Sequence, residues 1–429
     1  MSLEFEEQET DLTNVLLVGV DLGDDPDFEH SMEELKSLAK ACHKNVVGTV
    51  TQRMEMVNKG LYIGTGKVFE VKAVAEELGA EEVVFDNSLS PSQVRNLGRA
   101  LDLKVIDRNN LILDIFALRA QTKEAKLQVE TARLQYMLPR LVGMREALSR
   151  QGGTGGSMSN KGAGETKLEL DRRKIEHRIS ELRKELNEIS GNRMTQRKKR
   201  SESRIPQVSL VGYTNAGKST ILNRLVDRFG EGEEKNVLEK DMLFATLETH
   251  VRRIETGDNK PFLLADTVGF INKLPHNLVK AFRSTLEEVK YADLLLHVVD
   301  YSDENHKQHI KVTEDTLKEL GASDIPQIIV YNKVDKTDME LFPWVSDNRI
   351  YMAAGIGEGI DELLELIKEK VYAGNKDVSF LFPYSMGGVA SYFMDNATVL
   401  ENEYREDGVF IKVNCTVQDA EKYKEYVVG

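Results

Sequence analysis

The sequence predicts a multidomain α/β protein, and three observations support this fold class. With 429 residues, the chain is long enough for roughly three compact domains. Two regions alternate short apolar runs with helix-like stretches, which is typical of parallel sheets covered by helices. Between them lie long, charged helical patterns joined by a glycine-rich connector. The predicted parts are an N-terminal α/β domain (1–120), a basic helical hairpin with a Gly-rich loop (121–204), an α/β domain with a P-loop (205–372) and a small C-terminal α+β domain (373–429).

The composition is that of a soluble globular protein, with 41% hydrophobic residues, 30% charged residues and 9 prolines. The N-terminus from Met1 to Glu7 is acidic, and no apolar run approaches the roughly 18 residues of a membrane span. We therefore expect no membrane partner and a cytoplasmic location. The two cysteines, Cys42 and Cys415, lie in different predicted domains and form neither a disulfide framework nor a zinc site.

The charge of the chain is unevenly distributed. Its net charge is −14, which argues against indiscriminate nucleic-acid binding by the whole surface. Between Arg133 and Arg204, however, 18 Lys and Arg stand against 9 Asp and Glu. One basic segment thus lies in an otherwise acidic protein, and it includes the run Arg197–Arg200, for which we favour RNA contact over a solvated helix end.

The N-terminal region alternates predicted strands and helices. Strand-like apolar runs lie at Val15–Val20, Val46–Val50 and Glu82–Phe85, and helix-like stretches at Ser31–Ala41 and Lys67–Leu78. This alternation predicts a mostly parallel sheet. The stretch Gly64-Thr65-Gly66-Lys67 matches no full P-loop, and we favour a tight turn that caps a helix over a contact with a phosphate.

Long helices are predicted for Leu111–Ser149 and Thr166–Lys199, and we expect them to pack as an antiparallel hairpin. In the second, apolar residues recur three, four or seven positions apart, from Leu168 to Ile189. The connector Gln151–Gly164 has six glycines in 14 residues, too many for regular structure by itself.

Beyond Ile205, buried-strand runs end in polar clusters, and ligands of open α/β sheets bind at such strand ends. These runs are Val208–Val211, Phe262–Ala265, Leu294–Val299 and Gln327–Tyr331. After Tyr372, the segment from Val378 predicts a strand, a helix, two strands (Thr398–Glu403 and Val409–Asn414) and a last helix.

A P-loop pattern directly follows the first of these strands and begins a helix. Its predicted nucleotide-binding residues are Gly212, Tyr213, Thr214, Asn215, Ala216, Gly217, Lys218, Ser219 and Thr220. The glycines allow backbone N–H groups to surround a phosphate, Lys218 would reach phosphate oxygens as a catalytic residue, and Ser219 would offer its hydroxyl to Mg²⁺.

The base specificity is predicted by Asn332-Lys333-Val334-Asp335, which follows the Gln327–Tyr331 strand. A carboxylate can accept hydrogen bonds from both N1–H and N2–H₂ of guanine, whereas adenine offers no such pair of donors. Asp335 is therefore the predicted specificity residue. We expect Asn332 to hold the loop and Lys333 to cover the base, which makes GTP and GDP the predicted ligands.

Further nucleotide-binding residues are predicted after the P-loop: Phe244, Ala245, Thr246, Leu247 and Glu248, then Asp266, Thr267, Val268 and Gly269, and finally Ala353, Ala354 and Gly355. Asp266 would bind the Mg²⁺ shell through water, and Thr246 is the candidate second Mg²⁺ hydroxyl. Thr246 and Gly269 are also predicted catalytic residues, with the Gly269 N–H near the γ-phosphate. The Ala354 N–H would contact guanine O6, but Ala353 lacks the hydroxyl that usually supports this loop.

Two residues refine the expected mechanism. Phe270 stands where many GTPases place a glutamine that orients water, and a phenyl ring can neither accept nor donate that hydrogen bond. We therefore expect slow hydrolysis until a partner organises the site. For Asn215, two alternatives remain: it helps to bind a monovalent cation such as K⁺, or it only stabilises the loop.

Six further stretches follow one another along the chain: Tyr62–Lys67, Asp107–Phe116, Ala125–Glu130, Leu138–Leu141, Gly164–Arg173 and Asp266–Phe270. In these stretches, in this order, the chain resembles the HflX family of ribosome-associated GTPases. The resemblance implies a P-loop GTPase domain at 205–372, GTPase activity stimulated by ribosomes, binding to ribosomal RNA of the large subunit, and splitting or rescue of stalled ribosomes. The sequence departs from the family in Ala353 and in the connector, which lacks the arginine often found there. A basic helical hairpin with a flexible glycine loop is suited to contact the phosphates of ribosomal RNA.

Three functions are compatible with these patterns. The leading one is a monomeric GTPase that acts on the ribosome, and the runner-up is a GTP-switched binding module for another RNA or a protein. A membrane-remodelling GTPase is third, because no lipid-directed terminus is present.

Overall fold

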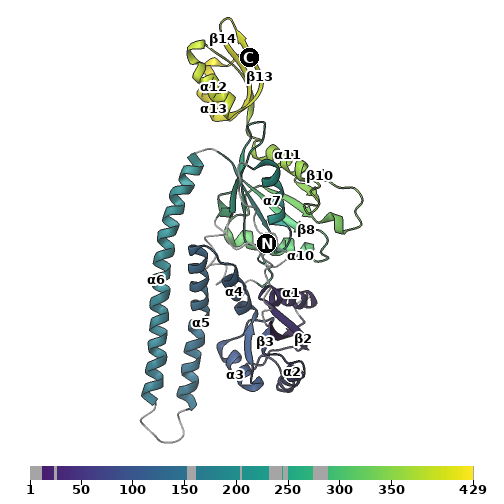
Figure 1. Ribbon diagram of the computed structural model, residues 1–429, viewed down its shortest axis with the longest axis vertical. Helices are drawn as coiled ribbons and strands as arrows, with labels where there is room; N and C mark the ends of the chain where they lie inside the picture. Colours follow the sequence, from purple (N-terminus) through teal and green to yellow (C-terminus); the bar gives the residue numbers. More distant parts are fainter. Residues whose placement is uncertain are drawn as a thin grey trace, which may run out of the picture. The chain divides into compact units, whose positions relative to one another are not determined.

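The computed structural model confirms the multidomain α/β class (Figure 1). It describes residues 12–23, 27–151, 161–202, 205–230, 244, 250–273 and 288–428. Within these ranges, it describes only the backbone at 142–151, 161–168, 190 and 192–202. The chain forms two compact units. The first contains Met1–Met194, Asp241–Leu247 and Asn272–Arg283, and the second contains the other residues.

The N-terminal domain is a four-stranded parallel sheet in the order β2-β1-β3-β4. Its strands are β1 (Thr13–Asp21), β2 (Lys44–Arg53), β3 (Glu82–Phe85) and β4 (Lys104–Asp107). Its helices are α1 (Phe28–Ala41), α2 (Thr65–Glu77), α3 (Pro91–Leu101) and α4 (Arg108–Arg119). The apolar runs of β1 and β3 are buried, whereas β2 is only partly buried. Gly64 is the N-cap of α2, as expected for its turn.

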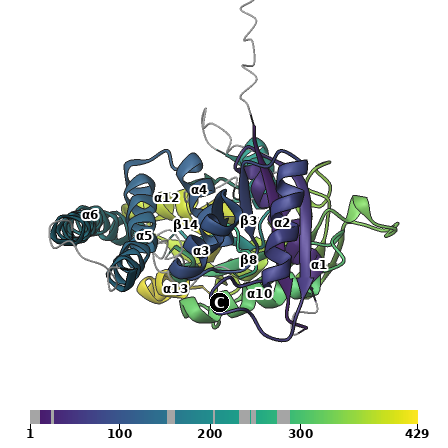
Figure 2. The same ribbon diagram turned by 90° about the horizontal axis from the view of Figure 1, so that it is seen from below.

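The helical hairpin consists of α5 (Lys123–Gln151) and α6 (Lys161–Glu202), which lie side by side in Figures 1 and 2. Leu182 of α6 is fully buried, and Arg178 pairs with Glu130 of α5 at 2.8 Å (Nε to Oε1). The predicted apolar spacing therefore does mark the contact face.

Two boundaries of this region were predicted wrongly. The stretch Leu111–Ser149 is not one helix, because α4 ends at Arg119 and the Thr122 hydroxyl accepts a hydrogen bond from Ala125 N, which starts α5. The second helix begins at Lys161, so Gly162–Gly164 are helical. An already started helix can extend through glycines at a modest cost of about 1 kcal/mol each.

The P-loop domain has a seven-stranded sheet in the order β10-β11-β9-β8-β5-β7-β6. The strands are β5 (Gln207–Gly212), β6 (His250–Ile254), β7 (Phe262–Asp266), β8 (Leu294–Asp300), β9 (Gln327–Asn332), β10 (Trp344–Ser346) and β11 (Arg349–Tyr351). The inner five strands are parallel, and the edge strands β6 and β10 are antiparallel to their neighbours. The described helices are α7 (Lys218–Phe229), η1 (Val334–Lys336), α10 (His306–Leu320) and α11 (Ile360–Val371). The parallel strands thus bring the polar clusters at their carboxyl ends together.

The C-terminal domain is an antiparallel three-stranded sheet, β12-β14-β13, with small helices. The elements are β12 (Lys376–Phe382), η2 (Tyr384–Met386), α12 (Gly387–Asn396), β13 (Thr398–Arg405), β14 (Gly408–Cys415), α13 (Val417–Lys422) and η3 (Lys424–Tyr426). The predicted order of strand, helix, two strands and helix is confirmed. Phe380, Phe382 and Phe393 fill its core.

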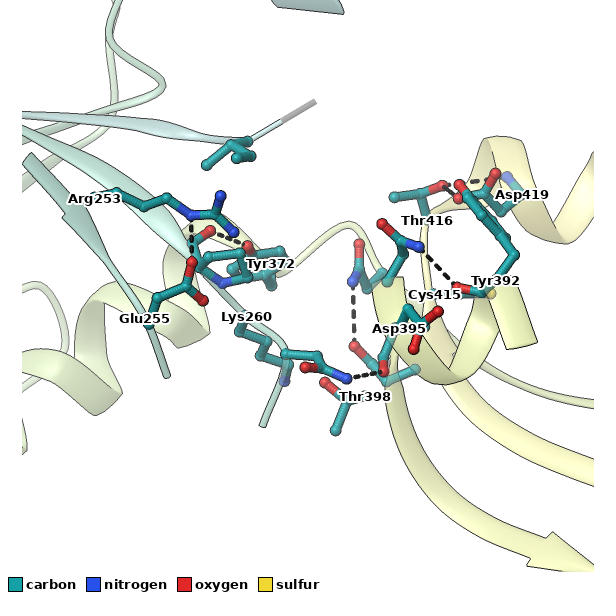
Figure 3. Close-up of a pocket in the computed structure, with 17 residues that line it drawn as sticks. Arg253, Glu255, Lys260, Tyr372, Tyr392, Asp395, Thr398, Cys415, Thr416 and Asp419 are labelled. Carbon is teal, nitrogen blue, oxygen red and sulfur yellow. Dashed lines mark hydrogen bonds and ion pairs between the residues drawn. The ribbon is translucent and has the colours of Figure 1, made fainter. Parts of the chain in front are cut away.

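A polar pocket of about 320 Å³ lies in the second unit (Figure 3). Lys260 lines it from the turn between β6 and β7, and Thr398 and Asp419 line it from the C-terminal domain. None of the described residues of the predicted nucleotide site is among its lining residues, so this pocket has no part in the chemistry below.

Candidate nucleotide site

The P-loop is shaped by two glycines that no other residue could replace without strain. Gly212 ends β5 at φ 143°, and a Cβ there would lie 2.1 Å from Val298 O. Gly217 has φ 98°, and its Cβ would lie 2.1 Å from Asn332 Nδ2. Asn215 also takes a left-handed φ of 60°, which asparagine tolerates better than most residues. The loop can therefore curl tightly enough to present N–H groups to a phosphate.

Lys218 begins α7, and its side chain is buried beneath this loop. Its Nζ donates to Gly212 O at 3.1 Å and to Tyr213 O at 2.7 Å. Burial, only partly offset by the charge of Asp266, lowers the pKa of Lys218 to about 8. A phosphate would supply the negative charge that this desolvated ammonium lacks.

This lowered pKa predicts a pH dependence of stability. Between about pH 8 and the ordinary lysine pKa of 10.5, the folded protein has released a proton that the unfolded chain still holds. The free energy of unfolding should therefore rise with pH in this window, by at most about 1.4 kcal/mol per pH unit. Urea unfolding of wild type and Lys218→Ala from pH 7 to pH 10, without nucleotide, isolates this contribution. We expect the difference, wild type minus variant, to increase with pH, and a constant difference would contradict the pKa assignment.

Asp266 ends β7 inside the protein and faces the start of α7. It is completely buried, and its Oδ2 accepts a hydrogen bond from Ser219 Oγ at 2.7 Å. The next residue, Thr267, is anchored by a hydrogen bond from its Oγ1 to Leu210 O at 2.6 Å. A buried carboxylate beside a hydroxyl is a pair of hard oxygen donors, the kind that suits Mg²⁺.

The segment after Asp266 is attached to the P-loop through its backbone. Phe270 N donates to Gly212 O at 3.1 Å, and Phe270 O accepts from Thr214 N at 2.8 Å. A Cβ on Gly269 would lie 2.9 Å from Lys218 Nζ and 2.8 Å from Thr214 Cα, so only glycine fits there. The Phe270 ring is buried, with 1% of the residue exposed. The Gly269 backbone thus lies close to the ammonium group of Lys218.

Asn332 joins three loops at the end of β9. Its Nδ2 donates to Ala216 O of the P-loop, and its Oδ1 accepts from Ala354 N, both at 2.9 Å. Lys333 has φ 62°, and its Nζ pairs with Asp300 Oδ2 at 2.7 Å. Asp335 follows in η1 and is exposed, so its carboxylate is accessible to a base.

The loop with Ala353, Ala354 and Gly355 connects β11 to α11. Ala353 and Ala354 are fully buried. The Ala354 N–H, which we expected at guanine O6, donates to Asn332 here, so a bond to O6 would share or replace this one. Ala353 N and O pair with Glu358 O and N, which closes the loop without a side-chain hydroxyl.

Two supports of the site were missed in the sequence. Arg224 of α7 donates to Ala354 O and Gly355 O. The sequence places His309 of α10 among charged residues, as for a surface side chain rather than a metal ligand, but the structure shows otherwise: His309 is buried, and its ring stacks on Tyr213 of the P-loop with centroids 3.8 Å apart. The sequence did contain a signal for this burial: His309 precedes the buried Thr313 and Leu317 by four and eight residues, which places all three on one face of α10.

A third residue that we did not single out, His297 of β8, is buried near the P-loop. Burial, and then the charge of Lys218, lower its pKa to about 4, so it is neutral at physiological pH.

The first compact unit contains segments that flank the site in sequence. The buried Phe244 packs against Phe116 of α4, edge to face, with ring centroids 4.7 Å apart. Lys273, which lies four residues after Gly269, pairs with the buried Asp86 at 3.0 Å. Arg108 donates to Asn272 O at 3.3 Å and to Asp86 Oδ1 at 2.7 Å. Ala245, Thr246, Leu247 and Glu248 lie outside the described residues.

A parallel sheet with this P-loop after β5, Asp-x-x-Gly after β7 and Asn-Lys-x-Asp after β9 is that of a P-loop GTPase. A family model described as GTP-binding GTPase N-terminal matches residues 29–117, and one described as GTP-binding GTPase Middle Region matches 119–200. A third, described as 50S ribosome-binding GTPase, matches 207–333.

Similar proteins extend this result over nearly the whole chain. A GTPase HflX of Caldanaerobacter subterraneus subsp. tengcongensis is 44% identical over 94% of this chain and 92% of its own. A GTPase HflX of Alkalihalophilus pseudofirmus is 47% identical over 81% of this chain and 80% of its own. Among solved structures, a complex of SsGBP with GDP matches with 25% identity and a TM-score of 0.45, over 84% of this chain and 99% of that one. The chain belongs to the HflX family of GTPases, which are GTP-hydrolysing enzymes.

Proposed function

We propose that this protein binds the large ribosomal subunit, hydrolyses GTP slowly until the ribosome stimulates it, and splits or rescues stalled ribosomes. The observation that carries the proposal is the match of its P-loop domain to the 50S ribosome-binding GTPase model, together with relatives that span the chain. Across the described residues, no helix is both long and apolar enough to cross a membrane.

In the proposed site, each group has one task. The P-loop N–H groups and Lys218 bind the phosphates, and Asp335 accepts from the guanine N1–H and N2–H₂. Ser219 would hold Mg²⁺ directly and Asp266 would hold it through water, since their adjacent oxygens suit that ion. Thr246 adds the second hydroxyl. When bound, Mg²⁺ neutralises phosphate charge.

The assignment of K⁺ to Asn215 stays an alternative. The left-handed backbone of Asn215 supports a role in shaping the loop, independent of any ion. Turnover compared in potassium and in sodium buffers distinguishes the two roles.

Slow intrinsic turnover follows from the surroundings of Gly269. Phe270 offers no polar side chain to a water molecule, and its ring is buried. Within the first unit, Lys273 contacts Asp86 and Phe244 contacts Phe116. These contacts give a route for stimulation, because a movement of the N-terminal domain would be transmitted along the chain to Gly269, four residues before Lys273, and to Thr246, two residues after Phe244. Ribosome binding would use this route to order the catalytic residues.

The proposed RNA contact is the helical hairpin. Its residues 133–204 carry the excess of Lys and Arg, and α5 and α6 form long, paired helices joined at a glycine-rich connector. Cationic side chains on such a hairpin would bind phosphates, which makes the affinity depend on salt.

Sedimentation with purified ribosomal subunits tests the proposal. We expect the protein to pellet with large subunits in the presence of a non-hydrolysable GTP analogue, and less with GDP. If it pellets with neither subunit in either state, the ribosomal function fails and a GTP-switched module for another RNA or protein is favoured.

Substitution of Asp335 tests the base specificity. In Asp335→Asn, the side-chain amide can donate to the O2 that xanthine has in place of the guanine amino group. We expect preference to shift from GTP toward xanthosine triphosphate by at least about tenfold, the effect of roughly one to two hydrogen bonds. Competition binding with both nucleotides measures it, and unchanged selectivity would remove Asp335 from this role.

A further inference from the structure

Two arginines on α7, one helical turn apart, face the loop between β11 and α11. Arg224 donates from Nε to Ala354 O at 3.2 Å and from Nη2 to Gly355 O at 2.6 Å. Arg228 donates to Gly357 O at 3.2 Å and pairs with Asp361 at 2.8 Å. The guanidinium of Arg224 therefore spans two consecutive carbonyls of the segment that faces the base in the proposed site.

This segment is held from two sides. Asn332 Oδ1 accepts from Ala354 N, while Arg224 donates to the carbonyl of the same residue. Ala353 contributes no hydroxyl, so its side chain cannot replace either support. A planar guanidinium with fixed donors orients two carbonyls more rigidly than a single hydroxyl does.

We propose that Arg224 is a positioning residue for guanine recognition: by holding the carbonyl of Ala354, it orients the Gly355 N–H of the same peptide group toward the guanine O6, while Asn332 holds the Ala354 N–H. The inference rests on the proposed GTP site and adds the residue that sets its recognition of O6. Arg224 itself does not touch the nucleotide, and Asp335 reads the other edge of the base.

Two nucleotide analogues separate these roles. In 6-thio-GDP, sulfur replaces O6 and is a weaker acceptor, whereas inosine diphosphate lacks only the 2-amino group read by Asp335. We would measure the dissociation constants of GDP, 6-thio-GDP and inosine diphosphate for the full-length chain and for Arg224→Ala, Arg224→Lys and Arg228→Ala. Arg228→Ala is the matched control, because it removes the same charge from the same helix.

We expect Arg224→Ala to weaken GDP binding about tenfold, the effect of roughly one lost hydrogen bond, and to bring the GDP and 6-thio-GDP constants together. Its preference for GDP over inosine diphosphate should stay as in wild type. Arg224→Lys keeps the positive charge but has its donors on a single nitrogen, so it should restore part of the preference for O6, and Arg228→Ala should keep all of it.

Other results would overturn the inference. An unchanged preference for GDP over 6-thio-GDP in Arg224→Ala would show that the loop keeps its geometry without this arginine. An equal fall in both preferences in Arg224→Ala would show a general loss of structure. Absence of guanine-nucleotide binding in wild type would instead contradict the proposed function.

Discussion

Lys218→Ala should abolish GTP hydrolysis and leave the fold intact. The buried ammonium lies close to Gly269, where an added Cβ would be 2.9 Å from it, and phosphate oxygens need such a charge during phosphoryl transfer. We expect turnover to fall by at least about a hundredfold, as for loss of one main electrostatic group in other active sites. Single-turnover hydrolysis of labelled GTP, with and without large subunits, measures the loss.

The fold should tolerate this change for a specific reason. The carbonyls of Gly212 and Tyr213, which lose the lysine, keep backbone donors at Phe270 N and Ala216 N. Removal of a desolvated charge also relieves a penalty. Circular dichroism and thermal unfolding without nucleotide provide the control, and a large loss of stability there would show that Lys218 serves the fold.

The hairpin variant should have the second large effect. Deletion of residues 152–164 with neutralisation of Arg197, Lys198, Lys199 and Arg200 removes the proposed RNA contact while the P-loop domain is unchanged. We expect the turnover of the free protein to stay nearly the same. Turnover with large subunits should fall by on the order of tenfold or more, and the salt dependence of binding should weaken by about 0.7 to 0.9 in slope per lost phosphate contact.

The comparison must be made at matched occupancy of the subunits, since weaker binding alone would lower turnover. Equal stimulation of variant and wild type under that condition would exclude the hairpin as the coupling element. The contacts of Lys273 with Asp86 and of Phe244 with Phe116 would then be the next route to test.

The parts of the fold that local patterns encode were predictable. Buried parallel strands such as β5 and β8 appear as continuous apolar runs, because both faces of the sheet are covered. The P-loop could be located because its short pattern contains glycines that the backbone requires. At Gly212, for example, φ is 143° and no Cβ would fit. The break between α4 and α5 was missed because the Thr122 cap interrupts a charged pattern that otherwise continues.

Contacts between distant residues were not predictable in the same way. Arg224 looks like a solvated residue on an amphipathic helix, and its carbonyl partners lie 130 and 131 positions away. Nor does any local pattern relate Lys273 to Asp86, 187 positions apart. His309 could have been recognised, because it continues the buried face of α10, but its stacking on Tyr213 depends on the assembled sheet.

The stimulation of GTP turnover by purified large ribosomal subunits tests the central proposal most directly. Turnover of the full-length chain would be measured alone, with large subunits and with small subunits, at several subunit concentrations. We expect slow turnover alone, a saturable increase with large subunits that Lys218→Ala abolishes, and little change with small subunits. Turnover that is unaffected by saturating large subunits, or already fast without them, would contradict the proposal.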